Sequence, residues 1–401
     1  MSRRITACLA LVLLASIASG AGTSAGAAPQ AMNARPRARD LGVPFDGTPG
    51  PLNAITDVGG VLVGHTTLIS GSGKLEVGKG PVRTGVTAVL PRGAASMQRF
   101  SFAGWYAQNG NGEMTGTTWV EESGFLEGPV MITNTHSVGV VRDAVIAWRI
   151  AHGPPDASGY WWSLPVVAET WDGWLNDING FHVRPEHVFH ALDTAHSGPV
   201  EEGAVGGGTG MVCNGFKGGI GTSSRRLPAK EGGYTVGVLV QCNYGTRQNL
   251  RVAGVAVGRE IESEDPYAWL PSGVAEYGSI IVVVATDAPL LPHQLKRLAR
   301  RVSLGLGRNG SIAGNGSGDI FIAFSTANAA AGRTDALVDL QMVPNGLMDP
   351  LFAATVQSTE EAIVNALVAA DDMTGIDGHH VRALPHEELR TVLRRYNRLA
   401  H

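Results

Sequence analysis

The feature that most constrains the fold of this 401-residue chain is a set of apolar runs that lack a polar face. Residues 279–286 read SIIVVVAT, and residues 234–242 have the same β-branched, uncharged character. A strand of this kind offers no side to water, so its sheet needs a covering layer on both faces. Shorter runs at 59–68, 84–91 and 129–135 are separated by Gly, Pro and Asn, which is typical of strands joined by turns.

Helical periodicity occupies other parts of the chain, mainly its last third. The spacing predicts helices over 140–151, from Pro185, after Pro289 and around Leu389 to Tyr396. Ser358 and Glu361 have the spacing of a capping box, which predicts that a helix begins there. Strand-rich regions bracketed by helices favour a layered α/β sandwich, and the absence of a linker-like break favours one domain.

The first 27 residues have the order of charges and apolar residues that is typical of a secretory signal peptide. Two arginines precede a 12-residue apolar stretch at 7–18, which is too short to span a bilayer, and small residues follow at 25–27. We therefore expect residues 1–27 to be removed and the mature chain to be periplasmic or secreted. No later apolar run reaches about 18 residues, so no membrane partner is expected after leader removal.

Charge and cysteine content limit the partners and the redox chemistry. The formal net charge is −4 and no basic run occurs, so nucleic acid is not an expected partner. Cys8 leaves with the leader, and the mature chain keeps Cys213 and Cys242. The sequence leaves open whether these two form a disulfide or remain buried thiols.

Several familiar functional motifs are absent or out of context. After the expected leader the chain has no G-x-S-x-G elbow, and it has no H-E-x-x-H sequence. The string GLGRNG at 305–310 matches a dinucleotide fingerprint by letter, but it ends a predicted helix instead of following a strand. The histidine pairs 187/190 and 379/380 are more typical of surface or packing positions than of a metal site. Spacing alone does not exclude a Ser-His-Asp triad.

The most informative segments are four polar strand ends. Ser279 follows Gly278 at the start of the longest predicted apolar strand. The segment 315–326 contains Ser317 and Asp319 just before a second apolar strand. Two further strand ends contribute polar side chains, in ETWDGWLND at 169–177 and in VQCNYG at 240–245. Taken by themselves, these residues also fit ordinary polar caps on strands.

These strings resemble the β-peptidyl aminopeptidase/L-aminopeptidase–D-esterase family of self-processing N-terminal-serine hydrolases. The resemblance starts at RDLGVPFDGTPG near residue 39 and extends to the C-terminal helices. It implies a four-layer αββα sandwich like that of N-terminal-nucleophile hydrolases. It also implies cleavage between Gly278 and Ser279, giving an α subunit of residues 28–278 and a β subunit of residues 279–401. A homo-oligomer of such heterodimers, usually a tetramer, is expected.

The resemblance also implies roles for individual residues. Ser279 is the nucleophile, and its own α-amine, which titrates near ~7.7–8, is the base once the chain is cut. Asn243 matches the asparagine that stabilises the oxyanion. Ser317 and Asp319 match the serine and the acid beside the nucleophile, where Asp319 holds the ammonium or orients Ser317.

Two residues are expected on the substrate side. Glu169 matches the acid that binds the free amine of the substrate by a charge-assisted hydrogen bond. Trp171 stands where some relatives have Tyr, so it supplies no phenol hydroxyl and is expected to line the pocket.

The expected function is an aminopeptidase that removes N-terminal β-amino acids, such as β-alanyl residues, from short peptides and peptide amides. No metal or organic cofactor is required by this chemistry. The alternative within the class is a D-/L-aminopeptidase with esterase activity on small N-terminal residues. Two alternatives come from other functional classes: a non-catalytic periplasmic binding protein and a serine hydrolase with a histidine base.

Overall fold

Two stacked sheets organise the computed structural model, which describes residues 35–153, 162–262, 266, 277–333 and 335–400. The smaller sheet has four strands, in the order β1 (Leu62–Ser70), β2 (Val82–Ala94), β5 (Val130–Asn134) and β6 (Val166–Thr170). The larger has six, in the order β4 (Phe125–Leu126), β3 (Ser101–Ala107), β12 (Gly316–Ser325), β11 (Tyr277–Thr286), β10 (Thr235–Asn243) and β9 (Gly219–Arg226).

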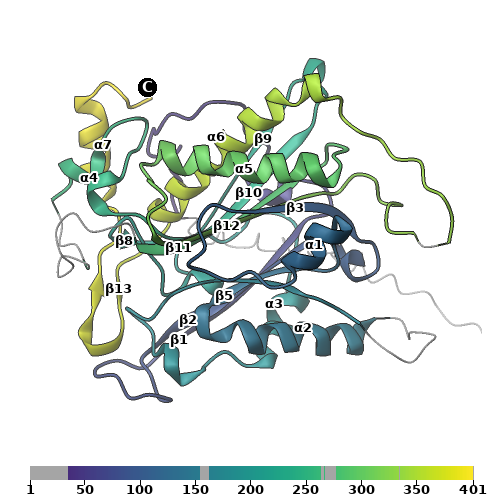
Figure 1. Cartoon of the computed structure of the whole chain (residues 1–401). Helices are drawn as coiled ribbons and strands as arrows, with labels where there is room; N and C mark the ends of the chain where they lie inside the picture. The colour runs from purple at the N-terminus through teal and green to yellow at the C-terminus, as the bar shows by residue number, and fades with distance from the viewer. Residues whose placement is uncertain (1–34, 154–161, 263–265, 267–276, 334, 401) are drawn as a thin grey trace, which may run out of the picture. The chain divides into compact units, whose positions relative to one another are not determined.

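Helices cover the outer face of each sheet (Figure 1). The smaller sheet packs on α2 (Val138–His152) and α3 (Pro185–Asp193), and the larger on α5 (Pro292–Arg308) and α6 (Asp349–Val368). A third apolar cluster fills the space between the two sheets. This arrangement is the expected four-layer αββα sandwich, and Pro36–His401 form one compact unit. The expected leader, residues 1–27, lies outside the described residues.

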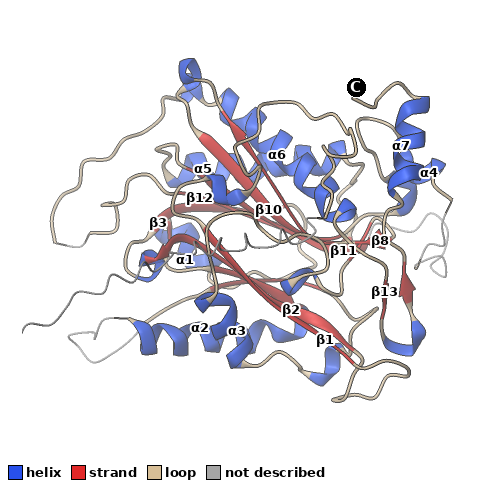
Figure 2. Cartoon of the chain, turned by 180° about the vertical axis from the view of Figure 1, so that it is seen from behind, coloured by secondary structure: helices blue, strands red, loops and turns tan. Residues whose placement is uncertain are grey.

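Shorter elements decorate this frame, as the view from behind shows (Figure 2). They are α1 (Thr117–Ser123), α4 (Val257–Glu260), α7 (His386–Arg395) and two small hairpins, β7 (Val212–Cys213) with β8 (Phe216–Lys217) and β13 (Met373–Thr374) with β14 (His380–Val381). Within the described part of the chain, no helix has the length and apolarity needed to cross a membrane.

Strand β11 is buried on both faces, as its apolar run predicts. Ile280, Val282 and Val284 pack in the cluster that contains α5 and α6, whereas Ile281, Val283 and Ala285 pack between the sheets. Alternation of side chains along a strand produces this division. The polar residue Ser279, at the start of the run, belongs to the inter-sheet set by the same alternation.

The predicted start of a helix at Ser358 is wrong. Helix α6 begins nine residues earlier, at Asp349, and Ser358 lies fully buried in its interior. Thr355 and Thr359 satisfy their hydroxyls on carbonyls one turn earlier, at 2.8 Å each, so polar residues here do not mark an end. Glu361 pairs with Arg39 at 2.7 Å and with Arg225 at 2.7 Å instead of capping the helix.

The glycine-rich segment 203–223 contains a strand that the periodicity did not reveal. β9 crosses beneath α6, and a Cβ on Gly221 would lie 2.0 Å from the Ala362 carbonyl oxygen. Helix and sheet therefore approach backbone to backbone, which only glycine permits.

Replacing Gly221 by Ala is expected to destabilise the fold by about 2–3 kcal/mol, because the helix must move away from the sheet. Gly139→Ala is the matched control: Gly139 lies in α2 with open space around it, so Ala there should stabilise by up to about 1 kcal/mol. Urea unfolding of both variants measures the difference. Equal stabilities would contradict the close approach.

Candidate active site

Ser279 lies where β11 meets both of its neighbours. It pairs with Asn243 of β10 and with Gly318 of β12, and its side chain is only 4% exposed. Residues directly opposite each other in an antiparallel pair project to the same face. The Ser279 hydroxyl and the Asn243 amide therefore share the inter-sheet face, at the end of the sheet where the apolar core stops.

The residue before Ser279 is constrained to glycine. Gly278 has φ +106°, and a Cβ on it would lie 2.0 Å from the Asn243 carbonyl oxygen. Both the backbone angle and the contact exclude any side chain. The bond between residues 278 and 279 is thus held against the backbone of the asparagine.

The Asn243 amide has a defined orientation. Its Oδ1 accepts the Val212 backbone N–H at 2.8 Å, and its Nδ2 donates to the Trp171 carbonyl at 2.9 Å. A backbone N–H only donates and a carbonyl only accepts, so the two contacts agree on which end is the oxygen. The second N–H of Nδ2 remains as a donor for a ligand.

Ser317 and Asp319 form a pair on the neighbouring strand. The Ser317 hydroxyl donates to Asp319 Oδ1 at 2.6 Å, and Asn109 Nδ2 donates to Asp319 Oδ2 at 3.2 Å. Ser317 stands opposite Gly278 in the register. Alternation along β12 turns both side chains to the face opposite the Ser279 side chain. The pair therefore borders the backbone at the 278–279 bond, not the hydroxyl.

Glu169, near the end of β6, is the acid that is expected to bind the substrate amine. Its oxygens accept the Glu113 backbone N–H at 2.9 Å and the Thr135 hydroxyl at 2.5 Å. Burial raises the pKa of this carboxyl, which the two hydrogen bonds partly offset. A Cβ on Gly112 would lie 3.4 Å from Glu169 Oε1 and 3.1 Å from the Gly318 Cα, so the acid lies beside the partner of Ser279.

Trp171 is 42% exposed, next to these groups. Its carbonyl accepts from Asn243, and its ring covers Gly173, where a Cβ would lie 2.5 Å from the indole. The exposed indole belongs to a residue whose carbonyl binds Asn243, so it lies at the border of the candidate site.

Two of the histidines, His65 and His379, make contacts with other residues. His65 bonds to the Thr87 hydroxyl at 3.0 Å, and burial lowers its pKa to about 4. His379 stacks on Trp174, with ring centroids 3.9 Å apart. No group of three or more His, Cys, Asp or Glu in the described residues is arranged to hold a metal ion.

The chain is similar to known proteins over most of its length. The profile of peptidase family S58 matches residues 53–381. The chain belongs to this family. It is 59% identical over 375 residues to the beta-peptidyl aminopeptidase BapA of Sphingosinicella microcystinivorans, covering 91% of this chain and 93% of that protein. The homologue of the same name from Sphingosinicella xenopeptidilytica is 49% identical over 373 residues, covering 90% and 92% of the two chains.

Solved structures extend the comparison of this S58 chain. A Burkholderia sp. beta-aminopeptidase has 49% identity and a TM-score of 0.81, over 90% of this chain and 98% of that one. The L-aminopeptidase D-Ala-esterase/amidase of Ochrobactrum anthropi has 51% identity and a TM-score of 0.84, over 91% and 100%. The latter is described as a prototype of the serine aminopeptidases and a variant of the N-terminal-nucleophile hydrolase fold. The expected fold and serine aminopeptidase class are thus confirmed.

The two cysteines that lie beyond the expected leader of this S58 chain form a disulfide. Cys213 and Cys242 are both fully buried, with Cα atoms 5.6 Å apart. The sequence left this pairing open, because a spacing of 29 residues does not fix it. Each cysteine directly adjoins one partner of the contact between Val212 and Asn243.

Asp172 is a buried acid that the motif analysis passed over, although it follows Trp171 in the same string. Its Oδ1 accepts from Asn176 Nδ2 at 3.0 Å, and its Oδ2 has no hydrogen-bond partner among the described residues. Burial raises the pKa of Asp172 to about 7. A carboxyl in this position is therefore protonated below neutral pH.

The raised pKa makes stability depend on pH in a defined direction. The pKa of Asp172 is ~3.9 in the unfolded chain and higher in the folded chain, so between these two pH values only the folded chain keeps the proton. The contribution of Asp172 to the free energy of unfolding therefore falls as pH rises through this range. The free energy of unfolding of Asp172→Asn, relative to that of the wild type, should therefore increase by up to about 1.4 kcal/mol per pH unit from pH 5 to pH 7. Urea unfolding at several pH values measures this, and parallel profiles for the two proteins would contradict it.

Proposed function

We propose that this chain is an aminopeptidase that releases N-terminal β-amino acids, such as β-alanyl residues, from short peptides and peptide amides. The observation that carries the proposal is the pairing of Ser279 with Asn243, which brings a hydroxyl and an oriented amide donor to one face. The substrate class is supported by the names of the relatives, which include beta-peptidyl and beta-aminopeptidases.

Maturation begins in the uncut chain. The Ser279 hydroxyl attacks the Gly278 carbonyl carbon, an ester bond forms to Oγ, and the peptide C–N bond breaks while the nitrogen gains a proton. Water then hydrolyses the ester, which leaves a Gly278 carboxylate and a free α-amine on Ser279. Gly278 supports this step because it leaves its carbonyl free of side-chain cover and is held at a fixed angle.

Turnover uses the same groups. The released α-amine takes the proton of the Ser279 hydroxyl as it attacks the substrate carbonyl, so nucleophile and base belong to one residue. Asn243 Nδ2–H stabilises the developing oxyanion by about 3 kcal/mol. Ser317 and Asp319 hold the amine. The substrate C–N bond breaks as the α-ammonium returns its proton to the leaving amine, which leaves an ester on Ser279 Oγ. Water then hydrolyses this ester and releases the acyl group as a carboxylate.

Glu169 selects substrates with a free N-terminal amine. Its carboxylate would bind the substrate ammonium, which replaces lost hydration by a charge-assisted hydrogen bond. Trp171 borders the acyl group. No metal or organic cofactor takes part, because the chain itself supplies the nucleophile, base and oxyanion donor.

The mature protein is proposed to be periplasmic or secreted, with residues 1–27 removed as a signal peptide. The Cys213–Cys242 disulfide supports this placement, since such bonds persist in oxidising compartments. The two subunits, residues 28–278 and 279–401, are proposed to assemble as a homo-oligomer of heterodimers, with a tetramer expected.

A D-/L-aminopeptidase with esterase activity is the second candidate, favoured by the likeness to the Ochrobactrum anthropi enzyme. A panel of β-alanyl, D-alanyl and L-alanyl p-nitroanilides separates the two. We expect kcat/KM to be highest for the β-alanyl compound. N-acetyl-β-alanyl p-nitroanilide is the control, and it should not be cleaved because it has no amine for Glu169. A preference for D-alanyl or L-alanyl substrate would favour the second candidate.

Ser279→Ala is expected to abolish both chain cleavage and turnover, because it removes the hydroxyl that attacks the carbonyl carbon in both reactions. His379→Ala is the matched control and should leave both intact, since its ring stacks on Trp174. A denaturing gel and N-terminal sequencing of the wild type, which should begin Ser-Ile-Ile-Val, provide the readout. One unbroken, active wild-type chain would refute the mechanism, and an unbroken chain that binds peptides without turnover would favour a binding protein.

A further inference from the structure

The small hairpin β7–β8, which we call the clamp (Val212–Lys217), is joined to the strand that carries Asn243. Its turn is Asn214-Gly215, with φ of 49° and 70°, the left-handed pair that a tight two-residue turn requires. The Asn214 backbone N–H donates to the Tyr244 carbonyl at 2.7 Å. The clamp is thus hydrogen-bonded to the residue that directly follows Asn243 at the end of β10.

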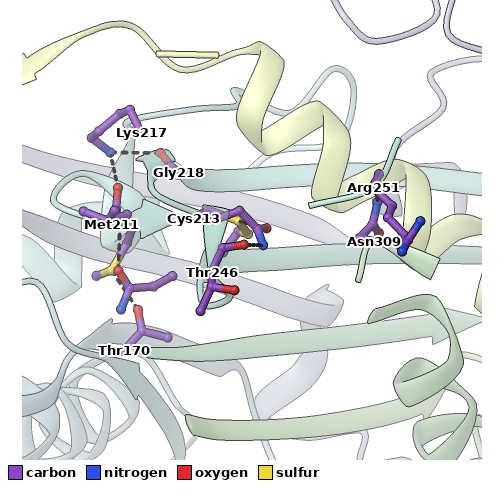
Figure 3. Close-up of a disulfide and its surroundings, with 12 residues drawn as sticks. Thr170, Met211, Cys213, Lys217, Gly218, Thr246, Arg251 and Asn309 are labelled. Atoms are coloured by element: carbon purple, nitrogen blue, oxygen red, sulfur yellow. Dashed lines mark hydrogen bonds between the residues drawn. A yellow bond between two sulfur atoms is a disulfide. The ribbon is translucent and has the colours of Figure 1, made fainter. Parts of the chain in front are cut away.

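Two strong links hold the clamp in place (Figure 3). The first is the Cys213–Cys242 disulfide, which joins the clamp covalently to β10. The second is the fully buried Lys217 ammonium, which donates to the Met211 and Gly218 carbonyls at 2.9 Å each. A buried cation surrounded by carbonyl oxygens is costly to displace, so Lys217 fixes the chain immediately before Val212.

Both links converge on one hydrogen bond. Cys213 follows Val212 and Cys242 precedes Asn243, so the disulfide brackets the contact from the Val212 N–H to Asn243 Oδ1 at 2.8 Å. If the Asn243 amide turned over, two donors would face each other at Val212. The lone pairs of Oδ1 would then face the oxyanion at Ser279 and repel it.

We propose that the Cys213–Cys242 disulfide and Lys217 are positioning groups for the reaction. They hold the Val212 N–H against Asn243 Oδ1 and so keep the Nδ2 donor aimed at the developing oxyanion. They touch neither substrate nor reacting atoms and act through Asn243. This inference rests on the proposed function, because it assumes that Asn243 stabilises the oxyanion.

Alanine variants of the cysteines test the proposal on the processed enzyme with β-alanyl p-nitroanilide. Cys213→Ala, Cys242→Ala and the double variant should each lower kcat by about 10-fold, a part of the 10²–10³-fold expected for losing the donor itself. The three losses should be equal, because either substitution breaks the same bond. KM should change less than twofold, because Glu169 is untouched. Lys217→Met should show the same split.

Two controls distinguish the proposed positioning role from a purely structural role of the disulfide. Val302→Ala removes core volume in α5, far along the chain from the clamp, and should lower the melting temperature without changing kcat. In an Asn243→Ala background, Cys242→Ala should cause no further loss of kcat, because a positioning group acts only through the residue it positions. Additive losses, or losses of kcat that follow the melting temperature across all variants, would overturn the proposal.

The outcomes distinguish this inference from the function on which it rests. If Asn243→Ala retains wild-type kcat, the assigned oxyanion donor is wrong and both fail. If Asn243→Ala lowers kcat while the double cysteine variant keeps it, only the positioning role fails. Chain cleavage followed on gels gives a second readout, since the cleavage oxyanion would use the same donor. Cleavage by the double variant should slow by a similar factor, and an unchanged rate would count against the proposal.

Discussion

The close approach of Gly278 to the Asn243 backbone is the constraint on which the rest of the site depends. It sets the point where β11 begins to pair with β10, and it therefore brings Ser279 opposite Asn243. A side chain at 278 would push the strands apart at their ends, and a shift of one residue would turn Ser279 to the other face of the sheet. The chemistry thus relies on a strand register that is held by one glycine.

The end of the inter-sheet layer changes from apolar to polar around this register. Above it, Ile281, Val283 and Ala285 pack against the smaller sheet. Directly opposite Ile281 on β10, Gln241 Nε2 donates to the Thr133 carbonyl at 3.0 Å and to the Thr170 hydroxyl at 2.8 Å, and so ties the sheets together beside the site. Hydrogen bonds in such a buried, low-dielectric setting are strong and rigid, which suits groups that must not reorganise during reaction.

Much of the layer architecture followed from local patterns. The two-sided burial of β11 and the helices α2, α3 and α5 were predicted from periodicity and composition. The start of α6 was not, because Ser358 and Glu361 have the spacing of a cap while their side chains are used in the interior. Glu361 forms ion pairs with Arg39 and Arg225. Both arginines lie well over a hundred residues before Glu361 in the chain, so no local sequence pattern predicts these ion pairs.

The sequence by itself determined which strands are buried on both faces, which serine follows a glycine at a strand mouth, and the family to which these strings belong. Those properties depend on neighbours within a few residues. Tertiary structure alone decided that Cys213 joins Cys242, that Ser317 and Asp319 face away from the Ser279 side chain, and that Asp172 is fully buried. The reason is physical: bond geometry, side-chain direction and desolvation arise only when segments distant in the chain pack together.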